Sequence, residues 1–78
     1  MKLTYHHVGI PTAVAERAIL GLRLSAGIGP DVASDPSLAA TLGWAIAEGL
    51  AERADGRTRL TQRGRLLANE VFARLLPD

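Results

Sequence analysis

Five arginines that lie close together in the sequence are the residues best suited to bind a ligand. They are Arg53, Arg57, Arg59, Arg63 and Arg65. Arg57 and Arg59 are two residues apart, so in an extended strand both side chains project from one side. A guanidinium group binds phosphate or carboxylate through paired N–H donors. The pattern is that of a possible contact for an anion or a nucleic acid, and a solvated strand face is the interpretation we favour.

Histidine and cysteine usage argues against a catalytic or metal site. His6 and His7 are the only histidines, and adjacent side chains in a strand point to opposite faces, so the pair is poorly placed to chelate one metal ion. The chain has no cysteine, which excludes disulfides, iron–sulfur clusters and a cysteine nucleophile. We expect no catalytic residue and no cofactor, and His7 is only a weak candidate for a metal ligand.

The helix predicted over residues 36–48 suits protein contact better than base recognition. It contains no Arg, Lys, Asn or Gln, which are the residues that read base edges in DNA. Its exposed side is predicted to carry Ala40, Gly43 and Trp44, and a smooth surface of small residues with one Trp is typical of a docking patch. We expect a protein partner or an adjacent catalytic domain there. Nucleic acid is disfavoured as a partner, and self-association is left open.

The elements that position these residues follow from capping and apolar periodicity. A first helix is predicted over residues 13–25, with Thr12 as its N-cap and Gly27 just beyond its end. Gly21 within it indicates the close approach of another element. The later segments are a linker or short strand at 28–30, a helical turn at 31–34, a helix at 36–48 capped by Asp35, a hairpin that turns at 55–56, and a last helix capped by Thr61.

The hairpin is expected to bury every second residue of each strand. The last helix is expected to bury apolar residues that recur every three or four positions. Asp55-Gly56 predicts a type I′ turn, because both residue types tolerate the positive φ that this turn requires. The hairpin residues expected on the face toward the core are Leu50, Glu52, Ala54, Thr58 and Leu60. The last helix is expected to present two apolar ridges, formed by Leu67, Val71 and Leu75 and by Ala68, Phe72 and Leu76.

Together these elements predict a mainly α, winged-helix-like domain with three to four helices and a two-stranded β-hairpin. A helical bundle is disfavoured, because it would not contain the β-hairpin that Asp55-Gly56 predicts. The domain is expected over residues 13–78. Residues 1–12 are expected to form an N-terminal extension that is either a short strand or disordered.

Composition limits the classes of function. The chain has 78 residues and a net charge of +1, which indicates one domain with no general attraction for polyanions. No apolar run approaches the roughly 18 residues that a membrane-spanning helix needs. The N-terminus also lacks the apolar core and cleavage site of a signal peptide. We therefore expect a cytoplasmic protein without membrane contact.

Three segments, taken in order, resemble one known family. They are Gly21-Leu22-Arg23-Leu24, then Glu48-Gly49-Leu50, then Leu60-Thr61-Gln62-Arg63-Gly64-Arg65-Leu66-Leu67-Ala68-Asn69. Their order and spacing resemble the C-terminal domain of the oxygen-independent coproporphyrinogen III oxidase-like radical SAM proteins, the HemN/HemW group. The resemblance covers residues 15–76. It implies a non-catalytic accessory domain that follows a catalytic barrel and is linked to haem biosynthesis or haem handling. Radical SAM chemistry is not implied here, because the cluster needs cysteines.

A second, shorter resemblance concerns the N-terminal segment. Tyr5-His6-His7-Val8-Gly9-Ile10-Pro11-Thr12 is similar to the first strand of glyoxalase-like vicinal oxygen chelate enzymes. In that family the His before Val-Gly-Ile binds a metal, so only His7 carries the resemblance. Such folds need a much longer chain and further ligands, which is why no metal site is predicted.

Overall fold

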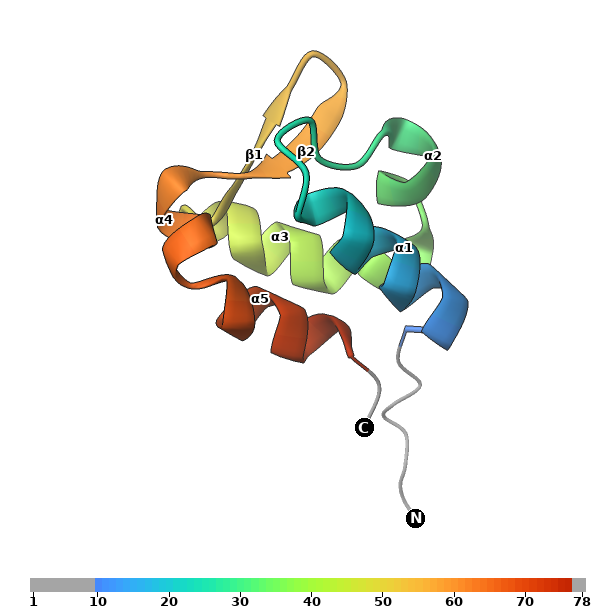
Figure 1. The fold of residues 1–78 in the computed structure, drawn as a ribbon. Coiled ribbons are helices and arrows are strands. Elements are labelled where there is room, and N and C mark those ends of the chain that lie inside the picture. The colour runs from blue at the N-terminus through green and yellow to red at the C-terminus, as the bar shows by residue number, and fades with distance from the viewer. Residues whose placement is uncertain (1–9, 77–78) are drawn as a thin grey trace.

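The computed structural model describes residues 10–76, and helices make up most of it (Figure 1). The elements in chain order are α1 (Thr12–Leu22), α2 (Pro30–Ala33), the 3-10 turn η2 (Pro36–Leu38), α3 (Ala39–Ala47), β1 (Ala51–Ala54), β2 (Arg57–Leu60), α4 (Gln62–Leu66) and α5 (Ala68–Leu75). The mainly α fold class with a two-stranded hairpin is confirmed. His6, His7 and the expected strand or disordered segment before residue 10 lie outside the described residues.

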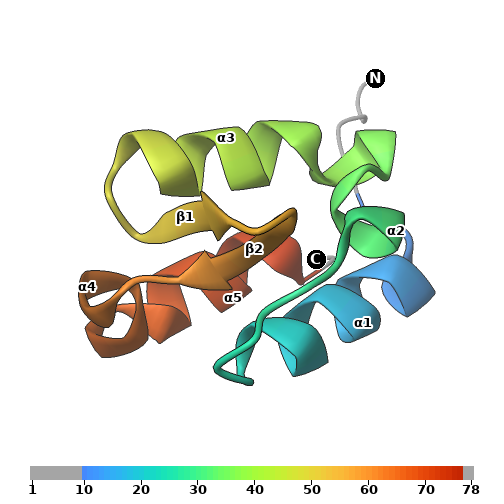
Figure 2. The ribbon, with the colours of Figure 1, turned by 90° about the horizontal axis from the view of Figure 1, so that it is seen from above.

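The core lies between three helices and the hairpin. Helices α1 and α3 lie on opposite sides of the molecule, and α5 contacts both of them (Figure 2). The side chains that these helices bury are Ala15, Ala18, Leu22, Leu42, Ala45, Val71 and Leu75. Each fully buried leucine contributes about 1.5–3 kcal/mol relative to exposure. The rest of the core comes from residues outside these three helices, which are Ile10, Ile28, Leu38, Leu50, Ala51 and Leu60.

Helix α1 is shorter than predicted. It begins at Thr12 after Pro11 and ends at Leu22, so Thr12 is not its N-cap and the helix does not reach residue 25. Gly27 has a positive φ of 73°, and its N–H bonds to the Leu24 carbonyl at 3.0 Å. The chain must leave the helix early because the residues after Gly27 turn back to pair with the hairpin.

That pairing is made by Ile28 as an isolated β-bridge to Thr58, so the segment predicted as a linker or a short strand is a linker that pairs with the hairpin at one residue. The Ile28 N–H bonds to the Thr58 carbonyl at 2.8 Å, and the Thr58 N–H bonds to the Ile28 carbonyl at 2.9 Å. The close approach predicted at Gly21 is confirmed, because a Cβ on Gly21 would collide with the Ile28 side chain. Gly21 therefore lets the segment that contains Ile28 lie against α1.

The hairpin turn has the predicted geometry, but β1 buries different residues from those predicted. Asp55 and Gly56 have φ values of 54° and 76°, as a type I′ turn requires. The register pairs Ala51 with Leu60, so Ala51, rather than Glu52, shares the buried face. The reason lies before the strand: Leu50 is buried, and its N–H bonds to the Ala45 carbonyl at 2.7 Å as an extension of α3. The strand alternation starts only after it.

The last helix is divided, where the sequence predicted one continuous helix. Thr61 caps α4 as expected, since its side chain accepts a 3.0 Å hydrogen bond from the Gly64 N–H. Leu67, with φ −111° and ψ 28°, separates α4 from α5. A Cβ on Gly64 would overlap the Leu50 carbonyl, so α4 lies directly on that backbone. The break at Leu67 lets α4 keep this contact while α5 packs against α1 and α3, and Leu67 itself is 40% exposed.

Candidate interaction surfaces

Arg57, one of the five arginines that are candidates for an anion contact, contacts the protein's own backbone. Its Nε donates a 2.9 Å hydrogen bond to the Ala26 carbonyl, and its Nη2 donates a 3.0 Å hydrogen bond to the Gly27 carbonyl. These carbonyls lie in the loop that follows α1. The guanidinium therefore joins β2 to this loop, and two of its donors are already used.

Arg59 is paired with an acid across the hairpin. The register places Glu52 opposite Arg59, and Arg59 Nε lies 2.8 Å from Glu52 Oε2. The two side chains are 45% and 46% exposed. An exposed pair of this kind contributes about 0–1 kcal/mol, so its main effect is to neutralise the local charge.

The remaining three arginines lie on different elements. Arg53 is opposite Thr58 on the other face of the hairpin from Arg57 and Arg59, and it lines a shallow hollow together with Pro30 of α2. Arg63 and Arg65 belong to α4 and are exposed. Within residues 10–76, these three side chains make no hydrogen bond to another described residue. The structure thus distributes the candidate anion contact over two hairpin faces and α4.

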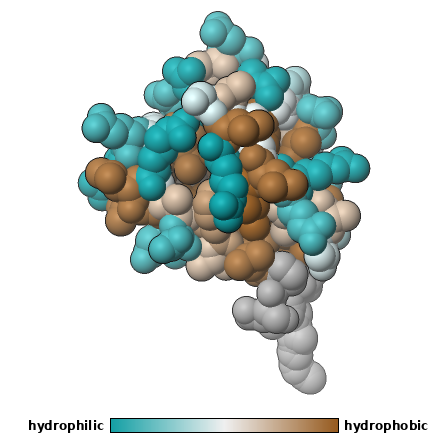
Figure 3. All heavy atoms as spheres, viewed as in Figure 1, coloured by the Kyte–Doolittle hydropathy of each residue, from teal (hydrophilic) through white to brown (hydrophobic). Residues whose placement is uncertain are grey.

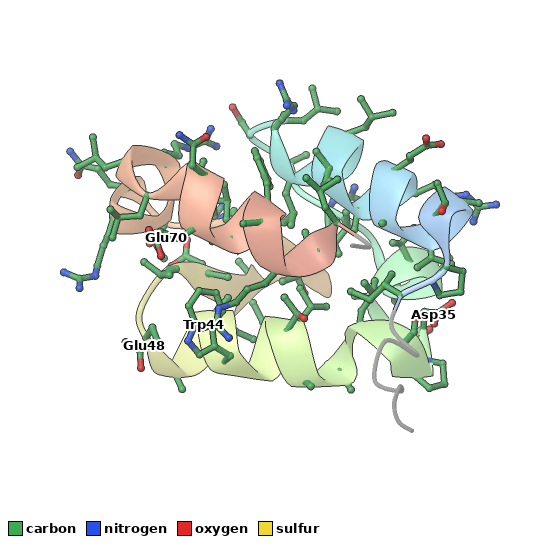
Figure 4. All side chains as sticks on the ribbon, turned by 90° about the horizontal axis from the view of Figure 1, so that it is seen from below. Asp35, Trp44, Glu48 and Glu70 are labelled. Carbon is green, nitrogen blue, oxygen red and sulfur yellow. The ribbon has the colours of Figure 1, made fainter. Side chains whose placement is uncertain are left out.

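The predicted docking face on α3 is open at its small residues and shielded at its tryptophan. Ala40 and Gly43 are exposed, and a Cβ on Gly43 would have no neighbouring atom within 4 Å. Trp44 is half-buried between α3 and α5 (Figure 4). The guanidinium carbon of Arg74 lies 3.9 Å from the centroid of its ring, which is the geometry of a cation–π contact. Arg74 therefore covers part of the aromatic surface.

A further exposed surface lies on α1, and the sequence patterns above did not single it out. Leu20 and Leu24 are 66% and 62% exposed, and Figure 3 shows apolar side chains gathered over α1 between polar ones. A shallow hollow on this helix is lined by Glu16, Ile19, Leu20 and Arg23. The available signal was a pair of leucines four residues apart and outside the buried stripe of Ala15, Ala18 and Leu22.

Charge at the start of η2 is stabilised by local hydrogen bonds. The Asp35 carboxylate accepts hydrogen bonds from the Ser37 hydroxyl at 2.6 Å and the Ser37 N–H at 2.9 Å. The side-chain bond, then the backbone bond, hold the pKa of Asp35 below its usual value, while partial burial opposes them. This is the N-cap predicted for residue 35, and it favours the charged form of the carboxyl group.

The part of the chain that the structure describes contains neither a metal-binding cluster nor a membrane-spanning helix. Residues 10–76 hold no group of three or more His, Cys, Asp or Glu side chains arranged to bind a metal ion. In the same residues, no helix has the length and apolar character that a bilayer crossing requires.

Comparison with known families identifies the domain type. The family model described as the HemN C-terminal domain matches residues 11–67. The chain belongs to the HemN C-terminal domain family. The match begins at the first residues of α1 and extends through the hairpin and α4, so it includes the Gly21, Gly27 and Gly64 contacts described above. No curated protein and no solved structure shows significant similarity to the chain.

Family membership agrees with the resemblance found in the sequence. The HemN C-terminal domain is distinct from the catalytic radical SAM domain of such proteins, and this chain has no cysteine to hold an iron–sulfur cluster. The features of this domain that remain available for function are therefore its exposed faces on α1 and α3.

Proposed function

We propose that this HemN C-terminal domain is a non-catalytic accessory module in the cytoplasm that docks on a protein surface, either a partner or an adjacent catalytic domain. The observation that carries the proposal is the α3 face on which Ala40 and Gly43 are exposed beside the half-buried Trp44. The family of this domain is described by its C-terminal place in a larger protein. By the resemblance to coproporphyrinogen III oxidase-like proteins, the domain is linked to haem biosynthesis or haem handling.

The shape of the α3 face supports close packing. Ala40 and Gly43 lie three residues apart on one side of the helix, and neither has a side chain that would hold a partner away. Small residues on a helix allow another backbone or side chain to approach closely. Glycine inside a helix lowers stability by about 0.5–1 kcal/mol relative to alanine, so an exposed Gly43 is better explained by contact than by folding.

Trp44 supports the proposal through its position beside this smooth patch. A half-buried tryptophan loses little conformational entropy on binding, because packing has already ordered it. Arg74 lies over the ring and provides a charged group at the edge of the patch. A partner that carries an apolar residue next to a carboxylate would satisfy Trp44 and Arg74 together.

A binding experiment with a matched control tests the proposal. The isotope-labelled domain is titrated with the N-terminal portion of a HemN protein that lacks its own C-terminal domain, and amide shifts are followed by NMR. Shifts are expected at α3 around Ala40 and Gly43. Gly43→Glu should abolish binding without unfolding, since the site of its Cβ is open, whereas Ala13→Glu at an exposed position of α1 should bind normally. Shifts confined to α1 or the hairpin would contradict the assignment to α3.

The alternative function is nucleic-acid binding through the arginine-rich hairpin. It is less well supported, because Arg57 is bonded to backbone carbonyls and Arg59 to Glu52. Of the five arginines, Arg53, Arg63 and Arg65 are the ones that make no hydrogen bond to a described residue, and they do not share one strand face. The salt dependence of binding distinguishes this alternative from docking, because contacts to phosphates weaken steeply as salt is added.

A further inference from the structure

The hollow on α1 has the geometry of a knobs-into-holes site. Its lining residues Glu16, Ile19, Leu20 and Arg23 stand at positions i, i+3, i+4 and i+7 of one helix. This is the set of four residues that forms the receiving hole of a coiled coil, into which one side chain of a facing helix inserts. Ile19 and Leu20 make its centre apolar, so an apolar side chain is the knob that fits.

The charges at the two ends of the hollow specify the direction of the facing helix. Glu16 lies at the N-terminal end, and Arg23 lies just past the last residue of α1 at the other end. A complementary helix must bring a base to Glu16 and an acid to Arg23. The guanidinium of Arg23 is already ordered, because it lies 5.2 Å from the centroid of the Phe72 ring.

We propose that the occupant of this hollow is α1 of a second copy of the chain, packed antiparallel across a twofold axis. Such an axis, passing between positions 19 and 20, places Glu16 of each copy opposite Arg23 of the other. It also places the Leu20 side chain, which is 66% exposed, over the hollow of the partner copy. One surface thus supplies knob, hole and both ion pairs, which is the self-complementarity that a twofold interface requires.

The expected association is weak. Helix α1 has 11 residues and is therefore about 16 Å long, so the contact is smaller than the roughly 800 Å² per partner of a standard interface. The dimer should form only at high protein concentration and weaken with added salt. It does not rest on the proposed docking function, since α1 and α3 lie on opposite sides of the molecule (Figure 2).

Sedimentation equilibrium from micromolar to millimolar concentration tests the association itself. The wild-type chain should show a monomer–dimer equilibrium, and Leu20→Ala should lower the association constant about tenfold or more. Leu66→Ala removes an even more exposed leucine, 81% accessible, from α4 and should leave the equilibrium unchanged. A wild-type chain that is monomeric at millimolar concentration would overturn the proposal, as would equal effects of the two leucine variants.

A charge-exchange experiment tests the antiparallel geometry. Glu16→Arg and Arg23→Glu each place like charges opposite one another in a homodimer, so each variant alone should be monomeric. Mixed together, they should form a heterodimer, because one chain then carries a base at both ends of its hollow and the other chain carries an acid at both ends. Circular dichroism checks that Arg23→Glu, which loses the Phe72 contact, still folds. A mixture of folded variants that stays monomeric would refute the arrangement.

Discussion

Arg57 Nε lies 2.9 Å from the carbonyl oxygen of Ala26, and this hydrogen bond joins residues that are 31 positions apart. The same guanidinium bonds to the Gly27 carbonyl through Nη2. Carbonyls that follow a helix have no partner within it, and an arginine fork can satisfy two of them at once. A residue that the sequence suggested for an external anion thus helps to hold the hairpin against the end of α1.

Replacing Arg57 should therefore reduce stability. Arg57→Lys keeps the charge but cannot reach both carbonyls with a planar fork, so the free energy of unfolding should fall by about 1–2 kcal/mol. Arg59→Ala breaks only an exposed ion pair and should change it by less than about 0.5 kcal/mol. Urea denaturation of the two variants measures the difference. Equal effects would show that the Ala26 and Gly27 bonds contribute nothing.

Two glycine substitutions with the same chemical change should have opposite effects. Gly64→Ala inserts a methyl group into the Leu50 backbone and should destabilise the domain by about 1–3 kcal/mol. Gly43→Ala adds a methyl group in open space within α3 and should stabilise it by about 0.4–1 kcal/mol. Thermal unfolding of both variants provides the measurement. A tolerated Gly64→Ala would mean that α4 does not lie against Leu50.

The Asp35 cap should give the domain an acid-sensitive contribution to stability. Its pKa is lowered in the folded state by hydrogen bonds from Ser37, so the contribution is fully present above the unfolded pKa and is lost as pH falls through the lower folded pKa. Asp35→Asn can still cap but cannot titrate. Melting temperatures of the two proteins should therefore converge or cross as the solution is acidified. Parallel curves throughout the acidic range would rule out this linkage.

Nucleic-acid binding should be weak and non-specific. In an NMR titration with duplex DNA at low salt, the amide signals of Arg57 and Arg59 should stay unmoved, because both side chains are engaged within the protein. Any residual binding should come from Arg53, Arg63 and Arg65. A steep fall of affinity with salt, together with loss of binding in Arg59→Ala, would instead favour the nucleic-acid alternative.

Local signals in the sequence were sufficient for several elements. Asp35 before Pro36, Thr61 before α4 and the Asp55-Gly56 turn act over a few residues, so their geometry depends little on the rest of the chain. The order of helices and hairpin followed from them. The family resemblance was also carried by short motifs, and the match over residues 11–67 confirms it.

Contacts between distant segments determined three features that could not be predicted from the sequence: the buried face of β1, the break between α4 and α5, and the bonding partners of the arginines. The face of β1 depended on how Leu50 leaves α3, and the division between α4 and α5 depended on the contact of Gly64 with Leu50. In the same way, the five arginines looked alike in sequence, but their bonding partners include the loop after α1, which is about 30 residues away. No local pattern contains that information.

The amino-acid sequence by itself determined the type of domain, the hairpin turn, the caps at Asp35 and Thr61, and the absence of thiol chemistry, because these depend on residue type and short spacing. Only the tertiary structure decided which arginines are engaged internally and which leucines of α1 remain exposed. Burial and charge pairing are properties of the packed chain, since a side chain is covered or left open by segments that lie far from it in sequence.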